Sequence, residues 1–335
     1  MLIAPEKMNA VLKDLFIKHH FTTEKAALMA SVFTESTLSG VHSHGINRVP
    51  LFIEHVKKGI IAVDSEATMV ASFGTMERWD GNSGAGIVNA TKCTSRAIEL
   101  AKNHGMGMVA LRNTNHWMRG GSYGHQAAQA GCISILFTNT KPNMPPWGAT
   151  DNRIGNNPLV ISIPRNKGNV VLDMALSQFS FGKINDHKLR GEQLPHYGGW
   201  DDDHKLTKDP EKILSNERGL PIGYWKGSAL SMVLDMLVTL LSAGNSTSSI
   251  SNKEIETNIS QVFLCIHPKA FNDNELQERL LEEIINFTRD ATLIHPDHNI
   301  YYPGERSATT RAAHLKNGMT INDDIWEKIE KLSTE

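Results

Sequence analysis

A short polar stretch between two helix-like segments carries residue types that can transfer a proton beside a bound carboxylate. It contains Ser43, His44 and Arg48. Imidazole titrates near neutral pH without help, so His44 is a candidate proton donor to a ketone. Arg48 follows four residues later, a spacing that puts both side chains on one face of a helical turn, and its planar fork suits a carboxylate. A polar loop with a helix cap is the alternative interpretation.

A second polar cluster follows an expected strand over residues 107–112. Asn113, Asn115 and His116 stand where that strand would deliver side chains to its end. We expect His116 to orient a substrate, although a hydrogen-bonded loop histidine is an equal alternative. The run 144–148 (MPPWG) offers an apolar wall for a ligand, and a proline-rich turn explains it as well.

Two other classes of function fit parts of the chain. His42 and His44, with His116 and an acid such as Asp201, could coordinate zinc or iron in a metal hydrolase, although the H-E-x-x-H pattern is missing. An interaction protein without catalysis could use exposed apolar helices such as 226–242. Metal analysis and NADH binding would separate these alternatives from a reductase.

Composition favours work on small molecules. The 335 residues carry 34 basic and 36 acidic side chains, a net charge of −2, which gives no field to attract nucleic acid or anionic lipid. The three cysteines are widely spaced in apolar contexts, as in a protein of the reducing cytoplasm. No charge-free apolar run is long enough for an export signal or a membrane span. We therefore expect a soluble cytoplasmic protein.

Hydrophobic periodicity predicts alternating strands and helices. Helices are expected over 5–19, 22–37, 47–59, 82–104, 124–130, 178–188, 226–242 and 274–290, and strands over 69–74, 107–112, 132–138, 159–164, 170–175 and 261–266. This alternation predicts a three-layer α/β/α architecture with helical segments at both ends. Residues 192–221 form the longest irregular stretch.

The usual signature of a dinucleotide site is missing. No G-x-G-x-x-G turn follows the first strand, and the run 81–86 (GNSGAG) has the wrong spacing, so we interpret it as a turn that starts a helix. The run 120–124 (GGSYG) also opens a helix and could place backbone amides near an anion. The residues alone therefore do not point to a dinucleotide site.

Several runs together resemble the type-2 malate/L-lactate dehydrogenase family. They are GVHSHGINR, LRNTNHWMRGGSYGHQAA, MPPWGA, IGNNPL, VLDMALSQFSFGKI, GYWKGSALSMVLDML and PGERS. The resemblance spans nearly the whole chain and implies a non-Rossmann mixed sheet that binds NAD(H) or NADP(H). It implies reduction of a 2-keto acid, which we expect to be a sugar acid, with malate, lactate or ureidoglycolate as alternatives. His44 would be the proton donor, with Ser43, Arg48 and His116 as substrate ligands.

The resemblance also implies which residues hold the cofactor. Asp173 ends an apolar strand beside a helix expected to begin near Ser177, and a strand end beside a helix N-terminus is a common ligand position. Lys226 starts an apolar helix, where a cation opposes the helix dipole and so suggests a phosphate partner. The implied cofactor residues are Val171, Leu172, Asp173, Met174, Ala175, Ser177, Trp225, Lys226, Gly304, Glu305 and Arg306.

Two expectations concern organisation. We expect a substrate-binding and dimerisation lobe over 1–122 and 291–335, and a dinucleotide-binding lobe over 123–290. The family's homodimers have the pocket near the subunit interface. Helices 5–19 and 226–242 carry more apolar surface than a small lobe could cover, which favours the same assembly here, although helix 226–242 could be buried instead.

Overall fold

A seven-stranded mixed sheet forms the centre of the molecule. The computed structural model describes residues 1–268 and 273–334. The strand order is β2-β3-β4-β10-β5-β6-β7, in which β3 and β4 run parallel and the other neighbours antiparallel. The strands are β2 (Thr68–Phe73), β3 (Met76–Asp80), β4 (Met106–Thr114), β5 (Ile133–Thr138), β6 (Leu159–Ile163), β7 (Val170–Met174) and β10 (Ile259–Ile266).

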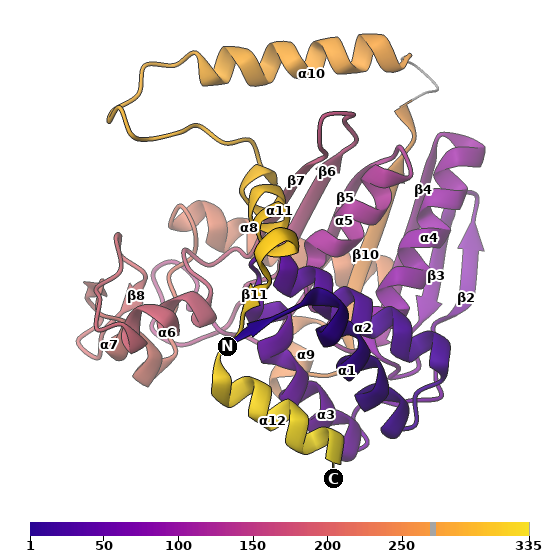
Figure 1. The fold of residues 1–335 in the computed structure, drawn as a ribbon, viewed down its shortest axis with the longest axis horizontal. Coiled ribbons are helices and arrows are strands. Elements are labelled where there is room, and N and C mark those ends of the chain that lie inside the picture. Colours follow the sequence, from indigo (N-terminus) through magenta and orange to yellow (C-terminus); the bar gives the residue numbers. More distant parts are fainter. Residues whose placement is uncertain (269–272, 335) are drawn as a thin grey trace.

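Helices cover both faces of this sheet. In Figure 1, α4 (Gly86–His104) and α5 (Gly120–Gln129) lie in front of the strands, and α8 (Trp225–Ser242) lies behind them. The front layer buries Val109, Leu111 and Phe263 against α4 and α5. The back layer buries Leu234 and Val238 of α8 against the other side of β4, β5 and β10. Apolar side chains therefore project from both faces of the central strands.

A further helical layer packs in front of α4. It contains α1 (Pro5–Lys18), α2 (Thr23–Leu38), α3 (Val49–Lys57) and α12 (Asp323–Thr334), and the two-stranded pair β1 (Leu2–Ile3) and β11 (Met319–Thr320) brings the chain ends together. Phe16, Phe33 and Phe52 meet at its centre with ring centroids 5.6 to 5.7 Å apart. The layer fixes the end of α2, from which the candidate active-site turn departs.

The remaining elements lie outside these layers. A small lobe at the left of Figure 1 holds α6 (Phe181–Leu189), β8 (Gly199–Trp200), β9 (Leu206–Thr207) and α7 (Pro210–Asn216). The short helix α9 (Thr247–Ser251) precedes β10. Helix α10 (Asn274–Arg289) lies at the top, where its Glu282 pairs with Arg165 after β6, and a long connection leads from it to α11 (Glu305–Asn317). Among the described residues, no helix is both long and apolar enough to cross a membrane.

The predicted architecture is confirmed, with several local corrections. Helix α4 begins at Gly86 and not at 82, and α5 begins at Gly120 and not at 124. Residues 76–80 form β3, although their polar character (MERWD) hid a strand whose Glu77 carboxylate is buried and paired with Arg96. Helix α6 begins at Phe181, not near 178, because the Ser180 side chain caps it by accepting a hydrogen bond from the Lys183 amide. The irregular stretch 192–221 contains β8, β9 and α7.

Candidate active site

The turn that carries His44 is held by the end of α2. Two short 3-10 turns, His42–His44 and Ile46–Arg48, follow each other there, so this segment is not the α-helical turn that the spacing suggested. The buried Thr37 hydroxyl accepts a hydrogen bond from the Ile46 amide at 2.9 Å. A Cβ atom at Gly45 would lie 2.3 Å from that hydroxyl oxygen, so only glycine fits between the two turns.

His44 stacks on His116. The two ring centroids are 5.7 Å apart with an interplanar angle of 17°, and the Ser43 hydroxyl lies 3.1 Å from Nδ1 of His44. Nδ1 of His116 accepts a hydrogen bond from the Met118 amide at 2.9 Å, so a neutral His116 carries its proton on Nε2. The structure thus brings together three of the predicted residues, from α2's end and from the end of β4.

Arg48 is next to the same pair. Within the described residues its guanidinium makes no hydrogen bond or ion pair, and burial lowers its pKa although Glu256 opposes the shift. Arg48, His116 and Glu256 line a small cavity of about 30 Å³, large enough for a water molecule. The Glu256 carboxylate accepts a hydrogen bond from the Lys141 amide at 2.8 Å, and burial raises its pKa. Arg48 is therefore a partly buried cation available to a substrate anion.

Asp173 differs from the prediction in its surroundings. The helix N-terminus beside it belongs to α5, not to the helix after Ser177, and the Gly121 amide donates to Oδ2 of Asp173 at 2.8 Å. The GGSYG run does meet an anion, but the anion is this carboxylate of β7. Arg119, the residue before α5, lies close by and interacts electrostatically with Asp173.

These charges set the protonation of the two histidines. Burial lowers the pKa of His44, Arg48 and Arg119 lower it further, and Asp173 opposes the shift. Burial and the cation of Arg48 hold the pKa of His116 well below its usual value. His116 is therefore a neutral hydrogen-bond donor through Nε2, and His44 is the histidine of the pair that has a carboxylate to support its charged form.

Of the residues in the metal-hydrolase alternative, His44 and His116 lie together, but His42 and Asp201 do not join them. The His42 ring faces His314 of α11, with centroids 6.3 Å apart, and Asp201 binds the Lys205 amide in the small lobe. No group of three or more His, Cys, Asp or Glu side chains in residues 1–268 and 273–334 is arranged to hold a metal ion. The structure gives this alternative no support.

One predicted cofactor segment, residues 171–177, is extended, and the other two predicted segments lie near its two ends. The Val171 amide at the start of β7 donates to the Pro303 carbonyl at 2.9 Å, which puts residues 304–306 beside it. Beyond β7, Ser177 forms a β-bridge with Pro221, and the Leu176 carbonyl accepts a hydrogen bond from the Ile222 amide. The chain continues from Ile222 to Trp225 and Lys226. Six residues of extended chain span roughly 20 Å, so an elongated ligand could reach from one end to the other.

Several features of this edge fit a bound nicotinamide dinucleotide. The Ser177 hydroxyl is buried without a partner among the described residues, and Lys226 is exposed. Gly304 has φ +96°, and a Cβ there would lie 3.2 Å from the Val171 nitrogen, so a close approach of the backbone is built in. A hydroxyl without a partner can hydrogen-bond a ribose, and an exposed cation or an accessible backbone amide can bind a phosphate.

Comparison with known proteins decides the family. Residues 3–330 match the profile of a family described as malate/L-lactate dehydrogenase. The chain belongs to that family. It is accordingly an NAD(P)-dependent dehydrogenase or reductase. A 2,3-diketo-L-gulonate reductase of Escherichia coli is 43% identical over 99% of this chain and all of its own length, and one of Escherichia fergusonii is 42% identical over the same shares.

Solved structures share the whole fold. The malate dehydrogenase of Entamoeba histolytica has a TM-score of 0.94 at 25% identity, and the sulfolactate dehydrogenase of Methanocaldococcus jannaschii has a TM-score of 0.90 at 29% identity. Each similarity covers 100% of this chain and 97% of the other. The expected non-Rossmann fold of the malate/L-lactate dehydrogenase family is therefore confirmed.

Sequence reasoning missed Arg119 and Glu256. Arg119 directly precedes two glycines that open a helix, a position at which a charged side chain borders an anion site, and this signal was present in the sequence. Glu256 lies in a polar run before β10 and has no local pattern to mark it. Its place beside Arg48 depends on pairing between segments far apart in the chain.

The electrostatics predict an order of titration. In long-range proton–nitrogen NMR spectra from about pH 5 to pH 8, His116 should remain neutral with its proton on Nε2. His44 should titrate with a midpoint below 6.5. Arg119→Gln should raise that midpoint, because a nearby cation disfavours imidazolium. An imidazolium signal from His116 at neutral pH would contradict this assignment, and His116→Gln and His44→Gln identify the signals.

Proposed function

We propose that the protein reduces a 2-keto sugar acid with NADH, and that the substrate is 2,3-diketo-L-gulonate, which becomes 3-keto-L-gulonate. The proposal rests on the stacked pair of His44 and His116 beside a partly buried Arg48. The names of the relatives at 43% identity support the choice of substrate. The three buried free cysteines support the accompanying proposal of a cytoplasmic location.

The site residues divide the work of the reaction. The cofactor, when bound, supplies a hydride to the carbonyl carbon. Arg48 holds the substrate carboxylate with its planar fork and so fixes which face of the ketone is presented. His44, as imidazolium, gives its proton to the developing alkoxide, and Ser43 lies beside it to hydrogen-bond the same oxygen. Neutral His116 donates from Nε2 and orients the substrate. In the reverse direction, neutral His44 accepts the proton.

Cofactor contacts are assigned to the edge of β7. We propose that Ser177 and Asp173, with the backbone of Val171, Leu172, Met174 and Ala175, line one side of the dinucleotide. Lys226 supplies the charge for a phosphate, beside the exposed Trp225 ring. Gly304, Glu305 and Arg306 lie at the other end. Glu305 forms an ion pair with Arg289 and accepts a hydrogen bond from the Tyr302 amide.

Oxidation of NADH and NADPH across a panel of 2-keto acids tests the proposed function. We expect the highest kcat/KM with 2,3-diketo-L-gulonate and NADH, and lower values with pyruvate, oxaloacetate and oxalurate. His44→Asn should lower turnover by roughly 10²–10⁴-fold, the usual range for general acid catalysis, while NADH binding remains. Faster reduction of oxaloacetate or pyruvate would replace the proposed substrate with that of a malate or lactate dehydrogenase. Turnover of His44→Asn within about tenfold of wild type would remove His44 as the proton donor.

Arg48 and Lys226 should affect different ligands. Arg48→Ala should raise the KM for the keto acid strongly, because losing a buried arginine–carboxylate pair costs roughly 2–5 kcal/mol, and should leave the Kd for NADH unchanged. Lys226→Ala should weaken NADH by about tenfold and leave the keto-acid requirement unchanged. Arg48→Lys is the matched control, because it keeps the charge and loses the fork. An unchanged KM in Arg48→Ala would refute the carboxylate assignment.

We also propose that the protein is a homodimer. We expected helix α1 to contribute to the interface, but it does not support the dimer, because its apolar residues are buried within the chain: Met8, Leu12, Leu15 and Phe16. Helix α8 supports the proposed dimer, because Met232, Met236 and Leu240 form a stripe at helical spacing and each is at least half exposed. Ile284 and Phe287 on α10 form a second exposed apolar stripe. A second copy of the chain is the partner we propose for both.

Sedimentation measures this assembly directly. Wild type should sediment as a dimer at micromolar concentration, and specific activity should fall on dilution together with the dimer fraction. Met236→Glu should dissociate the dimer, because it places a charge in the proposed interface. Leu189→Glu is the matched control, because Leu189 is 77% exposed on α6 in the small lobe. A monomer with full specific activity would overturn the proposal of an active site shared between two chains.

A further inference from the structure

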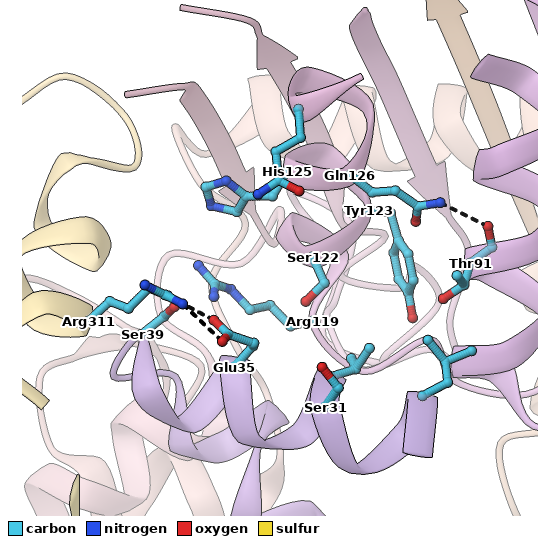
Figure 2. A pocket seen from close by; sticks show the side chains of 13 residues that line it. Ser31, Glu35, Ser39, Thr91, Arg119, Ser122, Tyr123, His125, Gln126 and Arg311 are labelled. Atoms are coloured by element: carbon cyan, nitrogen blue, oxygen red, sulfur yellow. Dashed lines mark hydrogen bonds and ion pairs between the residues drawn. The ribbon is translucent and has the colours of Figure 1, made fainter. Parts of the chain in front are cut away.

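A second cavity lies between α2, α4 and α5, with α11 at its rim. Its volume is about 630 Å³, and none of its lining residues lines the cavity beside Arg48 and His116. Figure 2 shows side chains from α2 below and α5 above turned toward this space. Its size exceeds what a few water molecules need, and its walls carry both charged groups and hydroxyls. It therefore has room for a small organic ligand.

An unpaired arginine is the main polar feature of this cavity. Arg119 is only 7% exposed, its Nε atom is buried without a partner, and its guanidinium makes no hydrogen bond or direct ion pair within the part of the chain that the structure describes. Figure 2 shows the guanidinium directed into the space between His125 and Glu35. Asp173 and Glu35 act on this cation only through space, and a buried charge that no hydrogen bond satisfies is costly, so the cavity favours an anionic group at this position.

The groups around Arg119 add donors and leave no competing free carboxylate at the rim. Both oxygens of Glu35 are engaged by Arg311, through Nε at 2.8 Å and Nη2 at 3.0 Å. Burial lowers the pKa of His125 to about 4, with Arg119 adding to the effect, so this imidazole is neutral at physiological pH. A neutral imidazole can donate one hydrogen bond to an anion. Arg119 and His125 therefore form one anion-binding end.

The rest of the cavity suits a hydroxylated carbon chain. Hydroxyls of Ser31, Ser39 and Ser122 face it, and each can both donate and accept. Leu28 and Val32 supply aliphatic surface between them. We propose that this cavity binds a sugar acid, with its carboxylate on Arg119 and His125 and its hydroxyls on the serine side chains. The cavity shares no lining residue with the proposed substrate site at His44, Arg48 and His116, and it accepts the same chemical class of molecule.

Calorimetry with D-gluconate as the probe tests this site. The full chain carrying Arg48→Ala is used, because that change removes the proposed carboxylate clamp of the reductase site and leaves the cavity intact. We expect one gluconate per chain, and acetate or sorbitol at least about tenfold weaker, because each supplies only half of the required contacts. Adding His125→Leu should weaken gluconate by roughly tenfold. Ser31→Leu, at an exposed position of α2, should do the same by filling the cavity.

The controls separate the possible results. Arg153→Gln, which removes an exposed arginine paired with Asp151 and outside the cavity, should leave gluconate binding unchanged. Thermal unfolding of each variant confirms that it is folded. Absence of gluconate binding, or equal binding of acetate and gluconate, would overturn the proposal. Loss of gluconate binding in saturating NAD⁺ would also overturn it, since the cavity would then belong to the cofactor. These results do not depend on whether the keto-acid panel identifies a substrate.

Discussion

The hydrogen bond between the Gly121 amide and the Asp173 carboxylate fixes the geometry on which the candidate active site depends. It joins the first turn of α5 to the edge strand β7 at 2.8 Å. A Cβ at Gly121 would lie 2.8 Å from the same oxygen, so the glycine is required for this approach. The contact places a negative charge where it acts on both His44 and Arg119. The N-terminus of α5 thus positions the negative charge that acts on both His44 and Arg119.

This arrangement explains how two stacked imidazoles can differ in function. Both rings lose solvent on burial, and both are close to the cation of Arg48, so the charged form of each is disfavoured. Asp173 opposes this effect at His44, whereas His116 has its Nδ1 committed to the Met118 amide. A proton donor must be able to hold the proton before it gives it away. The environment therefore favours His44 as the acid and keeps His116 as a fixed neutral donor.

The sequence predicted those parts that depend on local patterns. Strands with continuous apolar runs and helices with a clear period were found, and His44, Ser43 and Arg48 lie together because they are close in sequence. The strand β3 was missed because its buried Glu77 is paired with Arg96 of α4, a contact between two elements. Glu256 was missed for the same reason, since its significance comes from Arg48, which is distant in the chain. Arg119 had a local signal before the glycines of α5, but its electrostatic effect depends on the distant Asp173. Local pattern indicated the residues that we propose as the reacting groups, and tertiary pairing supplied their electrostatic neighbours.

The same contact explains why a dinucleotide enzyme can lack the glycine-rich turn. In a Rossmann fold the pyrophosphate takes the amides at a helix N-terminus beside the strand end. Here the α5 terminus is beside β7, but the carboxylate of Asp173 already accepts from the Gly121 amide and would repel a phosphate. A phosphate therefore needs a cation elsewhere, and Lys226 is exposed at the first turn of α8, near the end of the same extended chain. The occupied helix terminus thus accounts for the missing motif, and Lys226 is the cation that we propose for the phosphate.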